Sequence, residues 1–184
     1  MDIQFSIKKN ASQSGFSIVE LVITISIIVL VTGLSLARFS TFDNTVLLQS
    51  QAFEIAFDIR QAQQSGISVR ATEADKRSAF GIYFDESTRS QYIFFQDINN
   101  DEAYDVGEEL QTFIIDTRFE ITNIEILRSP PIEPSSASVT FKRPNFDGRI
   151  SPSGGDLEIT IAATRQSTNS KIIRVTQTGQ ITVE

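Results

Sequence analysis

The chain has neither cysteine nor histidine among its 184 residues. Without cysteine, disulfides, thiolate zinc sites and cysteine nucleophiles are excluded. Without histidine, the commonest general base and the commonest transition-metal ligand are missing. Only carboxylates, lysine, tyrosine and hydroxyl groups remain for chemistry, so the composition disfavours an enzyme and no catalytic residues are predicted. Ca²⁺, which binds oxygen ligands, stays compatible with this composition.

Basic residues are also scarce. Lys and Arg total 16 against 23 Asp and Glu, which gives a formal net charge of −7. Such an acidic chain is a poor non-specific ligand for nucleic acid, because the phosphate backbone selects positive charge. The C-terminal part nevertheless holds several basic residues, and their gathering on one face would keep DNA binding open: Lys142, Arg143, Arg149, Arg165, Lys171 and Arg174.

Charge is absent from one long stretch, Leu21–Ala37. About 20 apolar residues suffice to cross a bilayer as a helix, so residues 16–37 are predicted to form a transmembrane helix. The preceding residues are polar and include Lys8 and Lys9. Paired lysines favour a cytoplasmic N-terminus, with the bulk of the chain on the far side of the membrane, although Arg38 on the other flank weakens this preference.

Two kinds of processing fit this segment. One is secretory cleavage after Ser35-Leu36-Ala37, a small-x-small site that would remove the apolar helix. The other rests on Gly15-Phe16, followed by Glu20 at the boundary between polar and apolar residues. This pattern resembles the type IV prepilin motif, which implies that prepilin peptidase removes the leader, residues 1–15, and that Phe16 is N-methylated. A secretory signal needs no Glu in its apolar run, which favours the prepilin interpretation.

Glu20 then has a physical role. A carboxylate in hydrocarbon is costly and marks a functional site by default. Cleavage creates an α-amino group on Phe16 with an ordinary pKa of about 7.7–8.0, so this group is largely cationic at neutral pH. We expect Glu20 of one subunit to meet the Phe16 amine of a neighbour when their helices stack. In the alternative interpretation, Glu20 reaches back to the cytoplasmic headgroups.

The helical pattern continues beyond Arg38 and becomes amphipathic, predicting a helix over residues 38–66. Its apolar positions follow alternating spacings of four and three residues. They are Leu48, Ala52, Ile55, Ile59, Ala62 and Gly66. A neighbouring stripe adds Phe42, Val46, Phe53 and Phe57. Glycine commonly follows the last helical turn, so Gly66 is expected to cap the helix.

From Ala79 onward the pattern changes to that of strands, rich in β-branched and aromatic residues. Strands are predicted over residues 78–84, 91–96, 110–116, 119–127, 137–143, 156–164, 171–177 and 180–184. Turn signals fall at 85–88, 129–131, 145–148 and 153–155. The predicted fold class is α+β: a long N-terminal helix packed on an antiparallel β-rich domain over residues 67–184.

Three segments resemble those of the GspH/FimT-like pseudopilins. They are residues 47–70 in the helix, residues 139–150, and the last hairpin at 171–183. The resemblance implies a pilin-like fold and a structural subunit, either a minor pilin or a pseudopilin. Its filament would be a type IV pilus, a type II secretion pseudopilus or a DNA-uptake filament that binds DNA. It also implies other pilins as partners and a single-pass inner-membrane protein, with its C-terminal domain outside the cytoplasm before assembly.

One acidic loop has the spacing of a calcium site. Counted from Asp97, oxygen side chains occupy positions 1, 3, 5, 9 and 12, as in an EF-hand loop, with a backbone carbonyl at position 7. The candidate ligands are Asp97, Asn99, Asp101, Ala103, Asp105 and Glu108. Position 6 is Glu102 instead of the usual Gly, and the flanking segments are strands. The alternatives are a Ca²⁺ site and a hydrated acidic loop.

Overall fold

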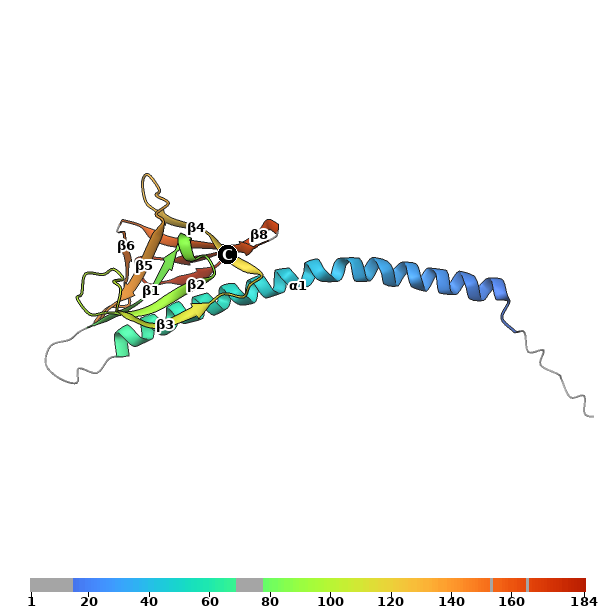
Figure 1. Cartoon of the computed structure of the whole chain (residues 1–184), viewed down its shortest axis with the longest axis horizontal. Helices are drawn as coiled ribbons and strands as arrows, with labels where there is room; N and C mark the ends of the chain where they lie inside the picture. Colours follow the sequence, from blue (N-terminus) through green and yellow to red (C-terminus); the bar gives the residue numbers. More distant parts are fainter. Residues whose placement is uncertain (1–14, 69–77, 153, 165) are drawn as a thin grey trace, which may run out of the picture. The chain divides into compact units, whose positions relative to one another are not determined.

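The structure is a computed structural model that describes residues 15–68, 78–152, 154–164 and 166–184. The predicted leader therefore lies outside the described residues, apart from Gly15. The chain divides into two compact units, Met1–Phe42 and Asp43–Glu184. A single helix, α1 (Ile18–Ser68), contributes to both units, as Figure 1 shows.

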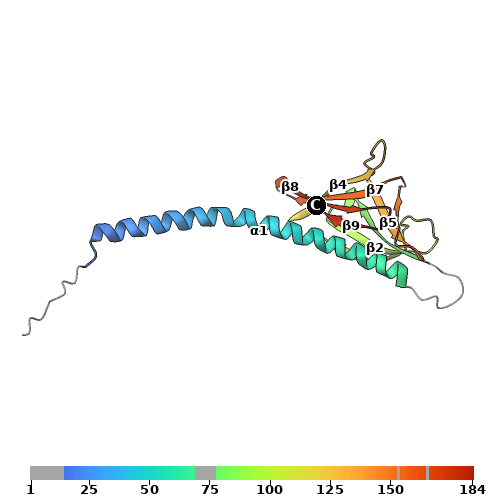
Figure 2. The same ribbon diagram turned by 180° about the vertical axis from the view of Figure 1, so that it is seen from behind.

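The second unit contains two antiparallel sheets (Figures 1 and 2). The first, sheet A, has the order β3-β2-β1-β5-β6, and the second, sheet B, has the order β4-β7-β8-β9. Sheet A comprises β1 (Ala79–Asp85), β2 (Gln91–Asp97), β3 (Glu109–Ile114), β5 (Ser136–Phe141) and β6 (Gly148–Ser151). Sheet B comprises β4 (Phe119–Leu127), β7 (Asp156–Ala163), β8 (Gln166–Val175) and β9 (Ile181–Val183). A short 3-10 helix, η1 (Glu86–Thr88), follows β1. The predicted α+β class is confirmed.

The core joins one face of α1 to the inner faces of both sheets. The predicted helical stripe is buried, with Ile55 and Ile59 fully excluded from solvent. They pack in one cluster with strand residues such as Phe84 of β1 and Ile159 of β7. Burying a side chain of this size contributes about 1.5–3 kcal/mol, so the amphipathic half of α1 is an integral part of the domain.

Gly66 is not the helix cap that we predicted, because α1 continues to Ser68. A Cβ atom at this position would lie 2.2 Å from the carbonyl oxygen of Phe141 in β5. Glycine is thus required by the close approach of helix and strand backbones. The helical spacing correctly predicted that Gly66 lies on the buried stripe. Only the prediction that Gly66 caps the helix was wrong.

The neighbouring stripe behaves differently from the first. The side chains of Val46, Phe53 and Phe57 are 51%, 54% and 65% exposed, and the side chain of Phe42 lies outside the described part. At 100° per residue, these three positions lie on the side of α1 opposite to Ile55 and Ile59. The second stripe is therefore an exposed apolar surface and not a continuation of the core.

Most predicted strands are confirmed within a few residues, and the closing hairpin turns at Gly179, which has a φ of 80°. Strand β6 was missed, because its four residues begin at a glycine that we assigned to a turn. It pairs with β5 from Phe141↔Gly148 to Ser138↔Ser151. Strand β8 begins at Gln166, five residues before the predicted start at Lys171, because its polar first half lacks an apolar alternation.

A buried polar pair ties α1 to sheet A. The hydroxyl of Tyr92 in β2 donates a hydrogen bond of 2.5 Å to the Asp58 carboxylate. Both residues are buried, at 2% and 7% exposure. Burial raises the pKa of Asp58, and the hydrogen bond from Tyr92 offsets this only in part. Burial and the adjacent Asp58 carboxylate together raise the pKa of the Tyr92 hydroxyl. The domain thus holds a carboxylate whose charge opposes folding.

This pair predicts a pH dependence of stability. Since the folded state binds the Asp58 proton more tightly than the unfolded state, the unfolding free energy should fall as pH rises from about 4 through the raised pKa. Asp58→Asn keeps an acceptor for Tyr92 and should remove this decline. Tyr92→Phe strands the carboxylate and should cost about 1–3 kcal/mol at neutral pH. Urea unfolding at several pH values measures both effects, and equal pH profiles for Asp58→Asn and the unmodified chain would contradict the assignment.

Candidate assembly helix and acidic loop

The predicted cleavage site lies just before the helix. Phe16 is 81% exposed, and α1 begins two residues later at Ile18. Glu20 is exposed and is the acidic residue of the first turn. A carboxylate in this place is favoured by the positive end of the helix dipole. Among the described residues, none donates a hydrogen bond to Glu20 and none forms an ion pair with it.

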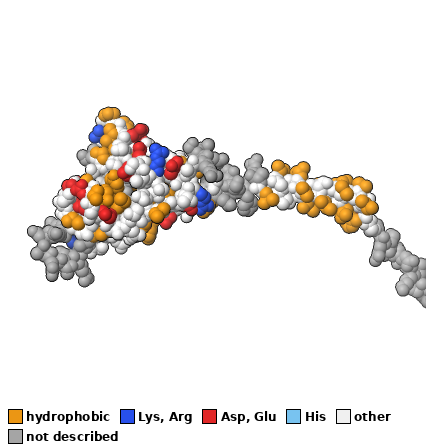
Figure 3. Space-filling view, viewed as in Figure 1, with side chains coloured by type: hydrophobic (Ala, Val, Ile, Leu, Met, Phe, Trp, Pro, Cys, Tyr) orange, Lys and Arg blue, Asp and Glu red, His pale blue; other side chains and the backbone are white. Residues whose placement is uncertain are grey.

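The first part of α1 is long and apolar enough to cross a membrane over Ile18–Leu36, with a mean hydropathy of 2.4. None of that window is buried against the rest of the chain. In Figure 3 apolar side chains cover this part of the helix on the visible face, whereas acidic and basic side chains gather on the β-rich domain. Contiguous apolar surfaces of this extent usually mark a site of contact with lipid or with another protein.

Hydroxyl side chains do not disturb this apolar character. The Thr24 hydroxyl donates to the Leu21 carbonyl at 2.8 Å, and the Ser26 hydroxyl donates to the Val22 carbonyl at 2.7 Å. Both polar groups are therefore satisfied within the helix itself. Because unsatisfied polar groups are costly in hydrocarbon, these internal bonds fit the segment to a membrane or to a bundle of apolar helices.

The acidic loop is held by bonds between its own carboxylates and its backbone. Asp97 is only 1% exposed, and its two oxygens accept from the amides of Asn100 (2.6 Å) and Glu102 (3.1 Å). Glu108 accepts from the amides of Ile98 (2.8 Å) and Asp105 (3.1 Å). Burial raises the pKa of Asp97, and the two amide bonds oppose this rise. Asp97 and Glu108, the first and last residues of the loop, thus fix the conformation of the loop backbone.

Glu102, at the position where calcium loops usually have glycine, adopts the left-handed conformation with a φ of 70°. Such a φ is uncommon for a residue with a side chain, so the backbone is strained at this position. Two contacts hold the residue there. Its amide donates to Asp97, and its carboxylate forms an ion pair with Arg149 of β6.

The loop crosses the outer face of sheet A. The Tyr104 ring lies 4.6 Å from the Tyr83 ring of β1 and 5.4 Å from the Phe95 ring of β2, measured between ring centroids. Lys142 donates to the side-chain oxygen of Asn100 at 2.7 Å. Phe95 is fully buried although it points away from the core face. The loop is consequently part of the packed domain, which the sequence did not indicate.

The fit of this loop to Ca²⁺ depends on Asn99. Its side-chain nitrogen donates to Asp101 at 2.9 Å and to Asp105 at 2.8 Å. The side-chain amide of Asn99 thus lies between the carboxylates of Asp101 and Asp105, the two groups that a bound cation would bridge. Among the described residues no group of three acidic side chains is arranged to hold a metal ion. A Ca²⁺ site requires the Asn99 amide to rotate so that its oxygen, not its nitrogen, joins the carboxylates.

Calcium binding remains a prediction with a direct test. If Asp101, Asp105 and the rotated Asn99 oxygen bind Ca²⁺, millimolar calcium should raise the melting temperature of the intact chain. The double variant Asp101→Asn, Asp105→Asn should lose this rise. It keeps acceptors for loop amides, so its stability without calcium is the control. If a calorimetric titration with Ca²⁺ gives no heat and calcium does not change the melting temperature, the hydrated acidic loop is the correct alternative.

Several of the basic residues on which the DNA-binding alternative depends have partners within the described part of the chain. Lys142 and Arg149 are engaged by the acidic loop, as described above. Arg174 forms ion pairs with Glu158 and, at 3.6 Å, with Glu184, and the adjacent Glu158 carboxylate raises the pKa of its guanidinium. Arg165 lies outside the described residues. Three of the six predicted residues thus have acidic or amide partners, and the DNA-binding alternative stays a prediction.

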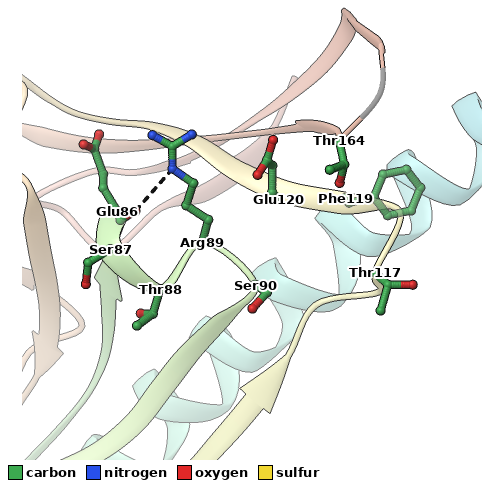
Figure 4. A pocket seen from close by; sticks show the side chains of 9 residues that line it. All are labelled: Glu86, Ser87, Thr88, Arg89, Ser90, Thr117, Phe119, Glu120 and Thr164. Atoms are coloured by element: carbon green, nitrogen blue, oxygen red, sulfur yellow. Dashed lines mark hydrogen bonds between the residues drawn. The ribbon is translucent and has the colours of Figure 1, made fainter.

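An open hollow of about 440 Å³ lies between η1 and the start of β4 (Figure 4). Five of its nine lining residues carry a hydroxyl group. The lining residues are Glu86, Ser87, Thr88, Arg89, Ser90, Thr117, Phe119, Glu120 and Thr164. The Arg89 side chain turns toward η1 and donates to the Glu86 carbonyl at 3.2 Å. Within the described part, none of these hydroxyls donates to a carboxylate, so the hollow offers no paired nucleophile and base.

Comparison with known proteins yields one structural likeness to report. Neither a protein-family profile nor a curated protein sequence matches the chain. The fold is similar to the crystal structure of the type IV minor pilin FimU of Pseudomonas aeruginosa, with 16% sequence identity and a TM-score of 0.47. The alignment covers 74% of this chain and 92% of that one. At this identity and TM-score the likeness carries no functional inference.

Proposed function

We propose that the chain is a membrane-anchored structural subunit, a minor pilin or pseudopilin, of a type IV pilus or type II secretion-type filament. Prepilin peptidase would remove residues 1–15, and Phe16 would become the N-methylated first residue. The observation that carries this proposal is the apolar segment Ile18–Leu36, which is not buried against the rest of the chain. It begins two residues after Phe16 of the Gly15-Phe16 pair, and Glu20 is its only charged residue.

The continuity of α1 supports this proposal over a secreted soluble protein. Cleavage after Ala37 would remove the first two fifths of a helix that runs without interruption from Ile18 to Ser68. Cleavage after Gly15 leaves the helix whole, with an exposed apolar first part and a buried face in its second part. A filament core built from helices uses such an apolar surface, whereas a secreted domain has no use for it.

The exposed stripe of Val46, Phe53 and Phe57 extends the apolar surface of α1 beyond the predicted membrane span. It lies opposite the core face, so a neighbouring helix could pack there without disturbing the domain. Three large apolar side chains, each more than half exposed, gain free energy when a neighbour covers them. The stripe supports assembly of several copies through α1.

Within the bundle, Glu20 is proposed to pair with the Phe16 amine of an adjacent subunit. Each charge would then offset the desolvation of the other, which isolated charges in hydrocarbon cannot do. In the membrane before assembly, Glu20 lies close enough to the helix start to reach the headgroup region. The pair therefore favours assembly over the single inserted chain.

The N-terminus of the mature protein tests the proposal. We expect the membrane-extracted chain, produced together with a prepilin peptidase, to start at Phe16, as read by N-terminal sequencing. Without the peptidase, the chain should stay in the membrane with its leader intact. A soluble product that starts at Arg38 would refute the proposal, because it would lack the assembly helix.

A further inference from the structure

The hollow between η1 and the start of β4 is a feature that the proposed function leaves unexplained (Figure 4). Its volume of about 440 Å³ lies within the range of roughly 300–1,000 Å³ that is usual for small-molecule sites. The lining combines five hydroxyl groups with two carboxylates and one guanidinium. Hydroxyls donate and accept, carboxylates accept and a guanidinium donates. The hollow therefore offers both kinds of hydrogen-bonding group to a polar ligand.

Backbone hydrogen bonds fix the walls of the hollow. The amide of Ile121 donates to the Arg89 carbonyl at 2.9 Å, which joins β4 to the segment that follows η1. The amide of Thr164 donates to the Arg118 carbonyl at 2.9 Å, which joins the end of β7 to the residue before β4. The hollow is therefore preformed, and a ligand that binds there has little backbone to order.

The charged groups of the lining are not paired with one another. The Arg89 Nε donates to the Glu86 carbonyl at 3.2 Å, which leaves both terminal amino groups of the guanidinium for other partners. In Figure 4 this guanidinium lies between the side chains of Glu86 and Glu120. Within the described residues, however, Arg89 forms no ion pair and neither carboxylate accepts a hydrogen bond. All three charged side chains are thus available to a ligand.

We propose that this hollow binds a neutral saccharide. Its two carboxylates outnumber its single guanidinium, and the whole chain has a formal charge of −7, so an anionic ligand is repelled. A cationic ligand would meet the guanidinium of Arg89. A sugar hydroxyl can donate to a carboxylate and accept from a guanidinium. Because carboxylates and guanidinium groups both bind two atoms at once, the neighbouring hydroxyls of a neutral sugar ring suit all three side chains.

Hydrogen bonds have to carry this recognition, because the hollow offers no open aromatic face. Phe119 belongs to the lining but is only 2% exposed, so a sugar ring cannot stack on it. The lining groups are hydrated in the free chain, and a hydrogen bond that replaces one to water gains little free energy. Several bonds must therefore form together. A hexose should bind at millimolar concentration, whereas glycerol, which has fewer hydroxyls, should not.

Saturation-transfer NMR on the full-length chain tests the proposal, in micelles of a detergent that has no sugar headgroup. The probes are glucose, galactose and mannose, and at least one of them should give a saturable signal at millimolar concentration. Glycerol should give none. The uronate and the 2-amino sugar derived from the best hexose carry one charge on the same ring. Both should bind at least about tenfold more weakly, because each meets a like charge in the hollow.

The variant Glu120→Gln locates the binding site. It replaces a charged acceptor of the hollow by a neutral amide of similar size, and it should weaken binding of the hexose by at least about tenfold, because hydrogen bonds to charged groups are the stronger ones. The matched control is Glu125→Gln. Glu125 is also half-buried on β4 but does not line the hollow, so this variant should bind like the unmodified chain. Melting curves verify that both variants fold.

The proposal would be overturned if none of the three hexoses gave a saturable signal, or if the charged derivatives bound as well as the neutral sugar. Unchanged binding by Glu120→Gln, or an equal loss in Glu125→Gln, would also overturn it. Neither variant alters the leader or α1, so the start of the mature chain at Phe16 tests the filament proposal separately.

Discussion

Replacing Glu20 with leucine is expected to abolish incorporation of the chain into filaments while leaving its membrane insertion unchanged or improved. Leucine makes the apolar segment more hydrophobic, so insertion gains. In the assembled bundle, however, the Phe16 amine of the neighbour would lose its only proposed partner. Removing one member of a buried ion pair typically costs about 3–5 kcal/mol, which is equivalent to roughly a hundredfold or greater loss in an assembly equilibrium.

The matched variant Glu20→Asp keeps the charge on a shorter side chain and should retain part of the assembly. Neither variant alters the cleaved Gly15–Phe16 bond, so processing to Phe16 is the internal control. Assembly is measured by the amount of the chain in sheared filaments relative to the membrane fraction. Full assembly of Glu20→Leu would show that Glu20 has no partner in the filament, as in the headgroup alternative.

Replacing Gly66 with alanine is expected to destabilise the β-rich domain more than any exposed substitution. The added Cβ would lie 2.2 Å from the Phe141 carbonyl oxygen and 2.8 Å from its carbonyl carbon. Both are backbone atoms of a strand in the middle of sheet A, so neither can move without shifting β5 or the helix. Overpacking of this kind costs about 1–3 kcal/mol, and more where the backbone must move.

Gly33 provides the control within the same helix. A Cβ added at Gly33 has no atom within 4 Å, so Gly33→Ala should leave thermal unfolding of the domain unchanged. Alanine also favours a helix over glycine by about 1 kcal/mol, which excludes loss of helix propensity as the cause of any effect at Gly66. A melting temperature for Gly66→Ala equal to that of the unmodified chain would show that the helix and β5 are less closely packed than described.

The buried face of α1 could be predicted because one helical period runs from Leu48 to Gly66 and its positions are all apolar or glycine; the buried Asp58 lies beside this stripe and was not predicted to be buried. The spacing of apolar residues could not show that Phe53 and Phe57 are exposed. An apolar residue on a helix predicts burial, but it does not tell whether the covering surface belongs to this chain or to another. Gly66 was misinterpreted for a related reason. Glycine both ends helices and permits close packing, and only the position of Phe141 distinguishes these roles.

In the acidic loop, the spacing of acidic residues along the sequence did not predict how their carboxylates are bound. The sequence identified the acidic positions, but it could not show that Asp97 and Glu108 are already satisfied by backbone amides. It also gave no sign that Tyr104 would cover Phe95, because that contact depends on the path of the loop over sheet A. Strand β6 escaped detection because four residues that include a glycine hold too little alternation to distinguish a strand from a turn.

The attachment of the acidic loop to sheet A has a consequence for proteolysis. Loop tips are the usual sites of attack by proteases, which need a stretch of backbone that can detach and enter their active sites. Here the amides of Ile98, Asn100 and Glu102 are each bound by a carboxylate of the same loop. The aromatic and ionic contacts to the sheet hold the remainder. A long surface segment of this domain is thereby withheld from digestion without a disulfide, which a chain lacking cysteine could not form.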